Sequence, residues 1–266
     1  MNGMQLYCRL LGASIRSQLQ YRASFLLAAG GQFFVTAVEF LGIWALFARF
    51  GQLQGWTLAE VALFYGTLSV ALALGDALGT GFDRMPAMVR GGDFDRVLTR
   101  PRYAFVQILG SELALRRVGR LAQGLVVLIA AIAILDIDWS GAHLALLLLT
   151  IAGGTCMFLA LFVIQGTLSF WTIESLETVN AFSYGGMTAG QYPITIYADW
   201  FRRFFTFVVP LACVSYFPLT LVLGRDDVLG VPAPVRAAAP LAGVLFLLAA
   251  IGFWRFGVRR YRSTGS

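Results

Sequence analysis

Charge is what this sequence has least of. Only 13% of its 266 residues are Asp, Glu, Lys or Arg, against about 25% in soluble globular proteins. Hydrophobic residues make up 58% of the chain, and the mean hydropathy is +0.75. These values exclude an ordinary soluble protein and predict an integral membrane protein. At about 20 residues per span, there is room for roughly five to seven crossings in one domain, residues 1–266.

Lysine is absent, because all twenty basic residues are arginines. A nucleotide-binding P-loop needs the lysine of GxxxxGK[ST] to reach the phosphates, so these residues cannot form one. The single histidine, His143, excludes histidine-cluster metal sites and haem held by two histidines of one chain. The three cysteines are too scattered for a zinc site, and we interpret them as packing residues: Cys8, Cys156 and Cys213. The net charge of +6 is interpreted as a topology signal, not a nucleic-acid surface, since the arginines flank apolar runs.

Long apolar runs are what the sequence does have. Residues 1–22 carry apolar positions every three or four residues among arginines, which predicts an interfacial amphipathic helix. A third span must begin near Phe105, because the apolar run 121–135 alone covers only about 22 Å of a roughly 30 Å layer. Together the runs predict an all-α, polytopic protein with spans near 23–48, 58–81, 105–135, 143–170 and 237–254.

The stretch from Trp171 to Arg225 can be divided in two ways. In one, a single span covers 204–224 and everything from 171 to 203 is cytoplasmic. In the other, a fairly polar helix near 179–191 crosses the membrane, and residues 192–224 form a broken hairpin that enters from the outer side and bends at Pro210 and Pro218. In both cases the chain has six transmembrane helices, and its C-terminus lies on the same side of the membrane.

The arginines predict the orientation. With the N-terminus inside, fifteen of the twenty arginines are cytoplasmic, and only Arg49, Arg225 and Arg236 are clearly outside. Both termini are therefore expected in the cytoplasm, and the loop between the second and third spans lies on the same side.

That loop contains the stretch "GGDFDRVLTRPR", residues 91–102. We expect a short helix over 93–98, with Asp93 as the N-cap and Arg100-Pro101 as its end. Phe94, Val97 and Leu98 share one face, which is typical of a helix that projects apolar side chains to dock a partner. The alternative is a basic loop held near anionic lipid headgroups, and the residues alone give it nearly equal weight.

Two acidic residues lie inside or near spans. Glu39 lies within the first span, where an ionisable side chain is costly, so it is a candidate for a substrate path. The alternatives are a position near the outer interface or a protonated, hydrogen-bonded carboxyl group. Asp76, near the inner end of the second span, is expected to pair with Arg84.

Taken together, these features resemble the permease subunits of ABC transporters of the type 2 export class, and most closely a bacterial branch with a Gly-x-Phe-Asp-x-x-Leu-x-Arg-Pro loop. Residues 92–101 match that loop at Gly92, Phe94, Asp95, Leu98, Arg100 and Pro101. The resemblance implies that residues 82–104 form a cytoplasmic coupling loop whose helix docks on an ATPase, and it favours the outer re-entrant hairpin at 192–224.

The resemblance also implies function and partners. The chain would be the non-enzymatic permease of an exporter in a bacterial inner membrane, working beside a second identical or homologous permease. A separate ATPase subunit would bind ATP and magnesium, and this chain would hold no cofactor. The rival class is a secondary transporter or channel that works alone, but the paired broken helices of an internal repeat are not evident. No Ser, His and Asp constellation or metal cluster supports an intramembrane enzyme.

Overall fold

The computed structural model describes positions 12 and 16 and residues 20–111, 114, 117–172, 184–186, 188–227 and 229–262. The described residues are helical, with no strand among them, which confirms the all-α prediction. Residues 1–11, 13–15 and 17–19 of the predicted amphipathic helix and most of the predicted helix 179–191 lie outside the described residues.

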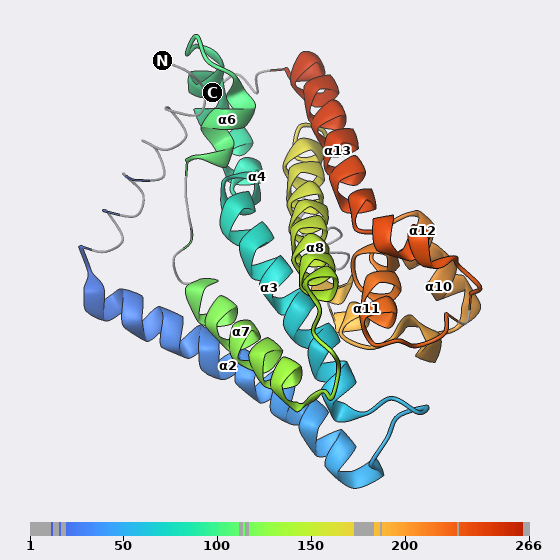
Figure 1. Cartoon of the computed structure of the whole chain (residues 1–266). Coiled ribbons are helices and arrows are strands. Elements are labelled where there is room, and N and C mark those ends of the chain that lie inside the picture. Colours follow the sequence, from blue (N-terminus) through green and yellow to red (C-terminus); the bar gives the residue numbers. More distant parts are fainter. Residues whose placement is uncertain are drawn as a thin grey trace.

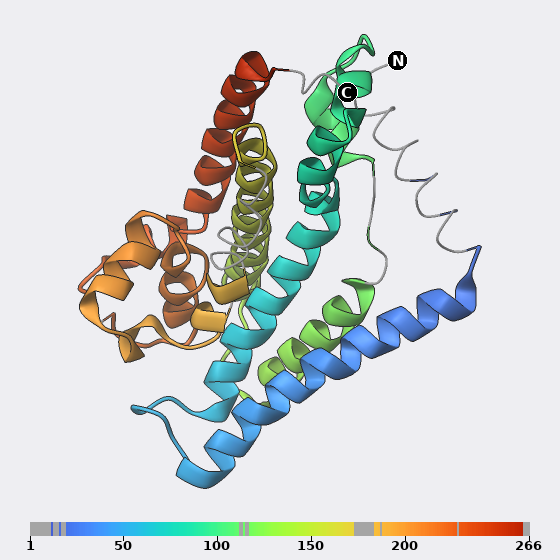
Figure 2. The same cartoon turned by 180° about the vertical axis from the view of Figure 1, so that it is seen from behind.

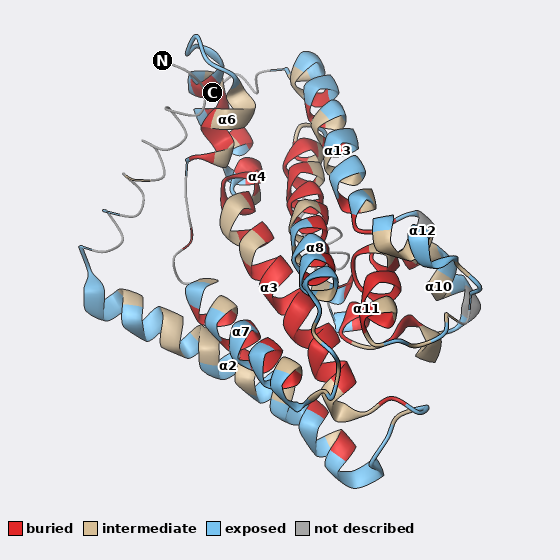
Figure 3. Cartoon of the chain, viewed as in Figure 1, coloured by how far each residue is buried: buried red, intermediate tan, exposed pale blue. Residues whose placement is uncertain are grey.

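Helix α3 (Leu58–Asp83) is the centre of the bundle (Figure 1). Its start is fixed by a capping box, in which the Thr57 hydroxyl accepts from the Glu60 amide and the Glu60 carboxylate accepts from the Thr57 amide at 2.8 Å. Helix α8 (Gly141–Leu168) packs against one side of α3, and α7 (Val118–Ile134) packs against the other. Burial is accordingly concentrated in α3 and in the half of α8 that faces it (Figure 3).

The outer layers are α13 (Leu241–Arg260), which lies against α8, and α2 (Arg22–Phe50), which lies against α7. Both views show α2 and α7 running side by side and obliquely to α3 (Figures 1 and 2). In lipid, helices associate by close packing, and small residues allow this. A side chain at Gly243 of α13 would overlap the carbonyl of Gly153 in α8, and one at Gly119 of α7 would overlap that of Ala29 in α2.

Among the described residues, four helices are long and apolar enough to cross a membrane: α2, α3 with the short α4 (Met85–Arg90) that continues it, α8 and α13. Helix α7 is apolar but has 17 residues, about 25 Å of helix. The prediction that the third span begins near Phe105 is wrong. Helix α6 (Ala104–Leu109) ends at Gly110, where the Ser111 hydroxyl bonds to the Ile108 carbonyl, and α7 starts only at Val118.

The segment before α13 is made of short helices: α10 (Asp199–Phe207), the 3₁₀ turn η3 (Ala212–Val214), α11 (Tyr216–Val222) and α12 (Ala233–Ala238). A single span over residues 204–224 is therefore wrong. Pro210 follows α10 and cannot donate a backbone hydrogen bond, so the chain bends there before α11 begins. These helices lie beside the half of α8 where that helix begins (Figures 1 and 2).

Candidate functional site

The loop between α3 and α7 folds into three short helices at one end of the bundle. They are α4 (Met85–Arg90), α5 (Asp93–Leu98) and α6, and the C-terminal end of α13 lies at the same end (Figure 1). The predicted helix 93–98 is confirmed to the residue. Gly92, with φ of 70°, makes the sharp turn between α4 and α5 in a conformation that residues with a Cβ rarely adopt.

The cap of α5 differs from the prediction. Gly92 is the N-cap residue and makes no side-chain cap, while Asp93 is the first helical residue. The Asp93 carboxylate instead faces Arg96, with 3.1 Å between Oδ1 and Nη1. Both side chains are more than half exposed, so this pair adds little to stability. An acid in the first turn still interacts favourably with the helix dipole.

The prediction that Phe94 is an exposed docking residue is wrong. Its exposed fraction is 0%, and its ring lies 5.1 Å from Phe170, 6.1 Å from Trp254 and 5.0 Å from Tyr261, measured between ring centroids. Phe170 follows α8, Trp254 belongs to α13 and Tyr261 follows α13. Phe94 therefore fixes α5 to the ends of two long helices.

These rings are part of a larger aromatic cluster. Phe82 near the end of α3 lies 5.2 Å from Trp254 and 5.2 Å from Phe105 of α6. Aromatic pairs in such tilted and edge-to-face arrangements contribute about 0.5–1.5 kcal/mol each beyond their buried area. We call this set the aromatic cluster, and it consists of Phe82, Phe94, Phe105, Phe170, Trp254 and Tyr261.

Tyr261 also connects the cluster to the acidic side of α5. Partial burial raises the pKa of the Tyr261 hydroxyl, and the nearby Asp95 carboxylate raises it further. The hydroxyl is therefore protonated at neutral pH. Asp95, the motif residue next to Phe94, therefore lies close to Tyr261, which follows α13.

The end of α5 is held from α6. Val97 is also buried, with 9% of its surface exposed, so it too faces the bundle and not a partner. The buried Gln107 side chain donates from Nε2 to the carbonyls of Val97 and Arg102, at 3.2 Å in each case. The Gln107 amide group is therefore hydrogen-bonded to both ends of the turn that contains Arg100 and Pro101.

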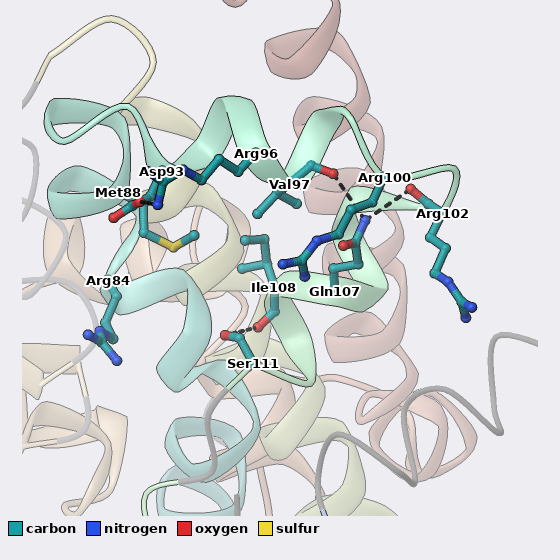
Figure 4. Close-up of a pocket in the computed structure, with 10 residues that line it drawn as sticks. All are labelled: Arg84, Met88, Asp93, Arg96, Val97, Arg100, Arg102, Gln107, Ile108 and Ser111. Atoms are coloured by element: carbon teal, nitrogen blue, oxygen red, sulfur yellow. Dashed lines mark hydrogen bonds and ion pairs between the residues drawn. The ribbon is translucent and has the colours of Figure 1, made fainter. Parts of the chain in front are cut away.

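What α5 presents outward is a charged face with one apolar side chain. Leu98 is 40% exposed, and Asp93, Arg96 and Arg100 are exposed beside it. Pro101, also exposed, follows directly. Next to this face lies a cavity of about 620 Å³, drawn in Figure 4, with Met88, Val97 and Ile108 among its apolar residues and four arginines at its walls: Arg84, Arg96, Arg100 and Arg102.

A second polar cluster was only partly foreseen. Asp76 of α3 is completely buried, and its partner is Arg117 at 2.9 Å, not the predicted Arg84. The Tyr184 hydroxyl donates to the same carboxylate at 3.3 Å, and the Arg120 guanidinium lies 5.6 Å from the Tyr184 ring centre. Asp76 lies 40 residues or more from Arg117 and Arg120 in the sequence, so the spacing of these residues could not predict that they pair.

Glu39 lies on the exposed side of α2, about 16 Å along the axis from the end of that helix at Phe50. Its neighbours on the surface are apolar and more than half exposed: Val35, Val38, Leu41 and Trp44. The structure does not place Glu39 beside the loop residues of α5 or the Asp76 cluster. A carboxylate amid apolar residues on an uncovered helix face is costly in lipid.

The long apolar helices define the class: a multi-pass, all-helical membrane protein. The family model described as ABC-2 family transporter protein matches residues 33–265. The chain belongs to this family, which supplies the permease component of ABC transporters. The matched range contains the whole of α3 to α13. No curated protein and no solved structure matched the chain.

Proposed function

We propose that the chain is the permease of an ATP-driven exporter and that a separate ATPase subunit docks on α5. The observation that carries this proposal is the two-sided character of α5. Phe94 and Val97 anchor the helix to the bundle, while Leu98 and the charged residues remain outside. A helix that only covered the membrane surface would have no need of contacts to both α8 and α13.

The outward face also indicates the partner's chemistry. Three arginines surround the exposed Leu98 on α5 and the turn after it: Arg96, Arg100 and Arg102. The complementary surface on the ATPase would be a groove with an apolar floor and an acidic rim. Movement of that groove would displace α5 and, through the aromatic cluster, the ends of α8 and α13.

The energy must come from the partner, because these 266 residues offer no lysine for a P-loop. The ATPase subunit would bind ATP together with magnesium, and the magnesium ion would bridge oxygens of the ATP phosphates. In this arrangement the present chain performs no hydrolysis and carries the substrate path.

The arginine distribution supports an orientation with the α5 end in the cytoplasm. Arginines cluster on α4 to α6 and at the end of α13, whereas Arg49, Arg225 and Arg236 lie toward the opposite end. In a bacterial inner membrane this orientation would put both termini in the cytoplasm. Residues 192–224 would then form a re-entrant hairpin from the outer side, consistent with the bend between α10 and α11.

A second permease, identical or homologous, would pack on the uncovered face of α2. Only 17% of the apolar window of α2 is buried within the chain, against 83% for α3. Contact there would cover Glu39 and place its carboxylate beside the path between the two permeases. Pairing also removes a charged side chain from the lipid-facing surface.

Exchange of Leu98 for Asp tests the docking proposal. We expect loss of at least about thirtyfold in affinity for the ATPase, since a buried apolar anchor in an interface is worth about 2 kcal/mol or more. The matched control is Leu144→Asp, because Leu144 is 44% exposed and lies in the first turn of α8, at the end of that helix away from α5.

The measurement is co-purification and titration of the ATPase encoded beside this chain with the detergent-solubilised permease, together with ATP-dependent export from vesicles. Retained ATPase binding by Leu98→Asp would refute docking on α5. Export that persists without ATP and without any ATPase would refute the exporter itself.

A further inference from the structure

A second cavity, of about 680 Å³, lies away from the α5 end. It is open on one side and lined by α10, α12 and the first turns of α13, with Cys213 and Phe217 from the segment between α10 and α12. Trp254, the contact of α13 with the aromatic cluster, is 13 residues beyond Leu241, or about 20 Å along the helix axis. The cavity is thus separate from the proposed docking site.

Most of its wall is aliphatic. Val235 of α12 is 55% exposed, and Leu241 and Leu245 of α13 are 49% and 66% exposed. Leu229 and Val231, which precede α12, continue the same wall. A volume of this size falls within the roughly 300–1,000 Å³ typical of small-molecule sites. The wall offers dispersion contacts and almost no hydrogen bonds, which suits a hydrocarbon chain.

The polar part of the lining comes from one helix. Arg202, Arg203 and Thr206 of α10 line the cavity, while Trp200 of the same helix is 72% exposed. An exposed tryptophan beside arginines is typical of the level where lipid headgroups lie. Two guanidinium groups next to an apolar cavity favour an anionic group with several oxygen acceptors.

We propose that this cavity binds an anionic phospholipid, with one acyl chain against α12 and α13 and the phosphate at Arg202 and Arg203. Headgroup charge provides the selectivity, because a choline or ethanolamine cation would meet two arginines. Cationic amphiphiles are excluded for the same reason. Binding requires only the permease chain, so it does not depend on the proposed ATPase.

The binding test uses the purified full-length chain in nanodiscs, without any ATPase. The probe is a phosphatidylglycerol with a photoactivatable diazirine in one acyl chain, and the matched probe is the phosphatidylcholine with the same chain. We expect labelling of peptides from α10 to α13. We also expect unlabelled phosphatidylglycerol to compete at least about tenfold better than phosphatidylcholine, because both lipids carry the phosphate but only the choline cation is repelled by Arg202 and Arg203.

Two variants separate the headgroup from the chain. Arg202→Gln/Arg203→Gln should reduce phosphatidylglycerol labelling about tenfold and leave phosphatidylcholine labelling unchanged. Leu245→Trp, at an exposed position, should fill the cavity and reduce labelling by both probes. Arg49→Gln, an arginine at the end of α2, is the control and should change neither.

The proposal is overturned if the label falls outside α10 to α13, or if the arginine variant binds phosphatidylglycerol as the Arg49 variant does. Equal competition by the two lipids with the unaltered chain would also overturn it. That competition requires no variant, so the proposal stays testable if a substitution prevents folding.

Discussion

Replacing Phe94 by alanine should release α5 from the bundle. The ring is fully buried and lies 5.0–6.1 Å from three other rings of the aromatic cluster. Truncation of such a residue costs about 3–5 kcal/mol. A six-residue helix is far too short to be stable without its packing, so we expect the loss to appear as local opening of α5. A cost of about 4 kcal/mol corresponds to a rise in the open population of up to about a thousandfold.

Limited trypsin digestion measures this opening, because the segment contains its own controls. Arg96 lies within α5 and should be protected in the unaltered chain, while Arg102 lies in the exposed turn and should be cut readily. Trypsin does not cut the bond between Arg100 and Pro101. When opening and closing are fast relative to cleavage, the cleavage rate follows the open population.

We expect Phe94→Ala to increase cleavage after Arg96 by at least about tenfold relative to cleavage after Arg102. The matched control is Leu98→Ala on the same helix, where 40% exposure predicts a change within about 0.5 kcal/mol. If cleavage after Arg96 is as slow in Phe94→Ala as in Leu98→Ala, the aromatic anchor does not hold α5, and the reasoning fails.

Two further changes test the bundle itself by denaturation in nanodiscs. Gly243→Leu should destabilise the fold by about 1–3 kcal/mol, because the new side chain would overlap the α8 backbone. Gly252→Leu should be neutral, because a Cβ there meets nothing within 4 Å. Equal effects of the two variants would contradict the close contact between Gly243 and α8. Asp76→Asn should lower the free energy of unfolding by about 3–5 kcal/mol, because it leaves the largely buried Arg117 without a charge partner. Asp93→Asn, which removes one partner of an exposed pair, should change it little. An Asp76→Asn protein as stable as the unaltered chain would refute the stabilising role of the Asp76–Arg117 pair.

Much of the fold was predictable from short stretches of sequence. Two glycines, an early acid and an Arg-Pro pair determine where a short helix begins and ends, so α5 was predictable to the residue. Long apolar runs likewise predicted α2, α3 and α8 closely, because length and hydropathy are properties of each segment alone. The last span was predicted at 237–254, whereas α13 covers Leu241–Arg260.

Features that depend on distant segments were missed. Periodicity placed Phe94, Val97 and Leu98 on one side of a helix but could not say which of them face the bundle. Phe94 turned inward because Phe170 and Trp254, from later in the chain, provide aromatic partners there. The end of α6 at Leu109 was also missed, and this helix packs closely on α3, where a Cβ at Gly81 would overlap the Ile108 carbonyl.

Helix α13 lies close to α8 near both of its ends, at Gly243 and at Gly257, so a rigid tilt of α13 about Gly243 would move its two ends by different amounts. Near its start, Gly243 is in backbone contact with α8, which makes a natural pivot. Trp254 in the aromatic cluster is eleven residues further on, so a tilt of about 10° about Gly243 would carry it roughly 3 Å sideways over an arm of about 16 Å. Leu241, on the other side of the pivot, would move in the opposite direction and much less. A tilt that moves α13 far at the α5 end would therefore move it only slightly beside the second cavity.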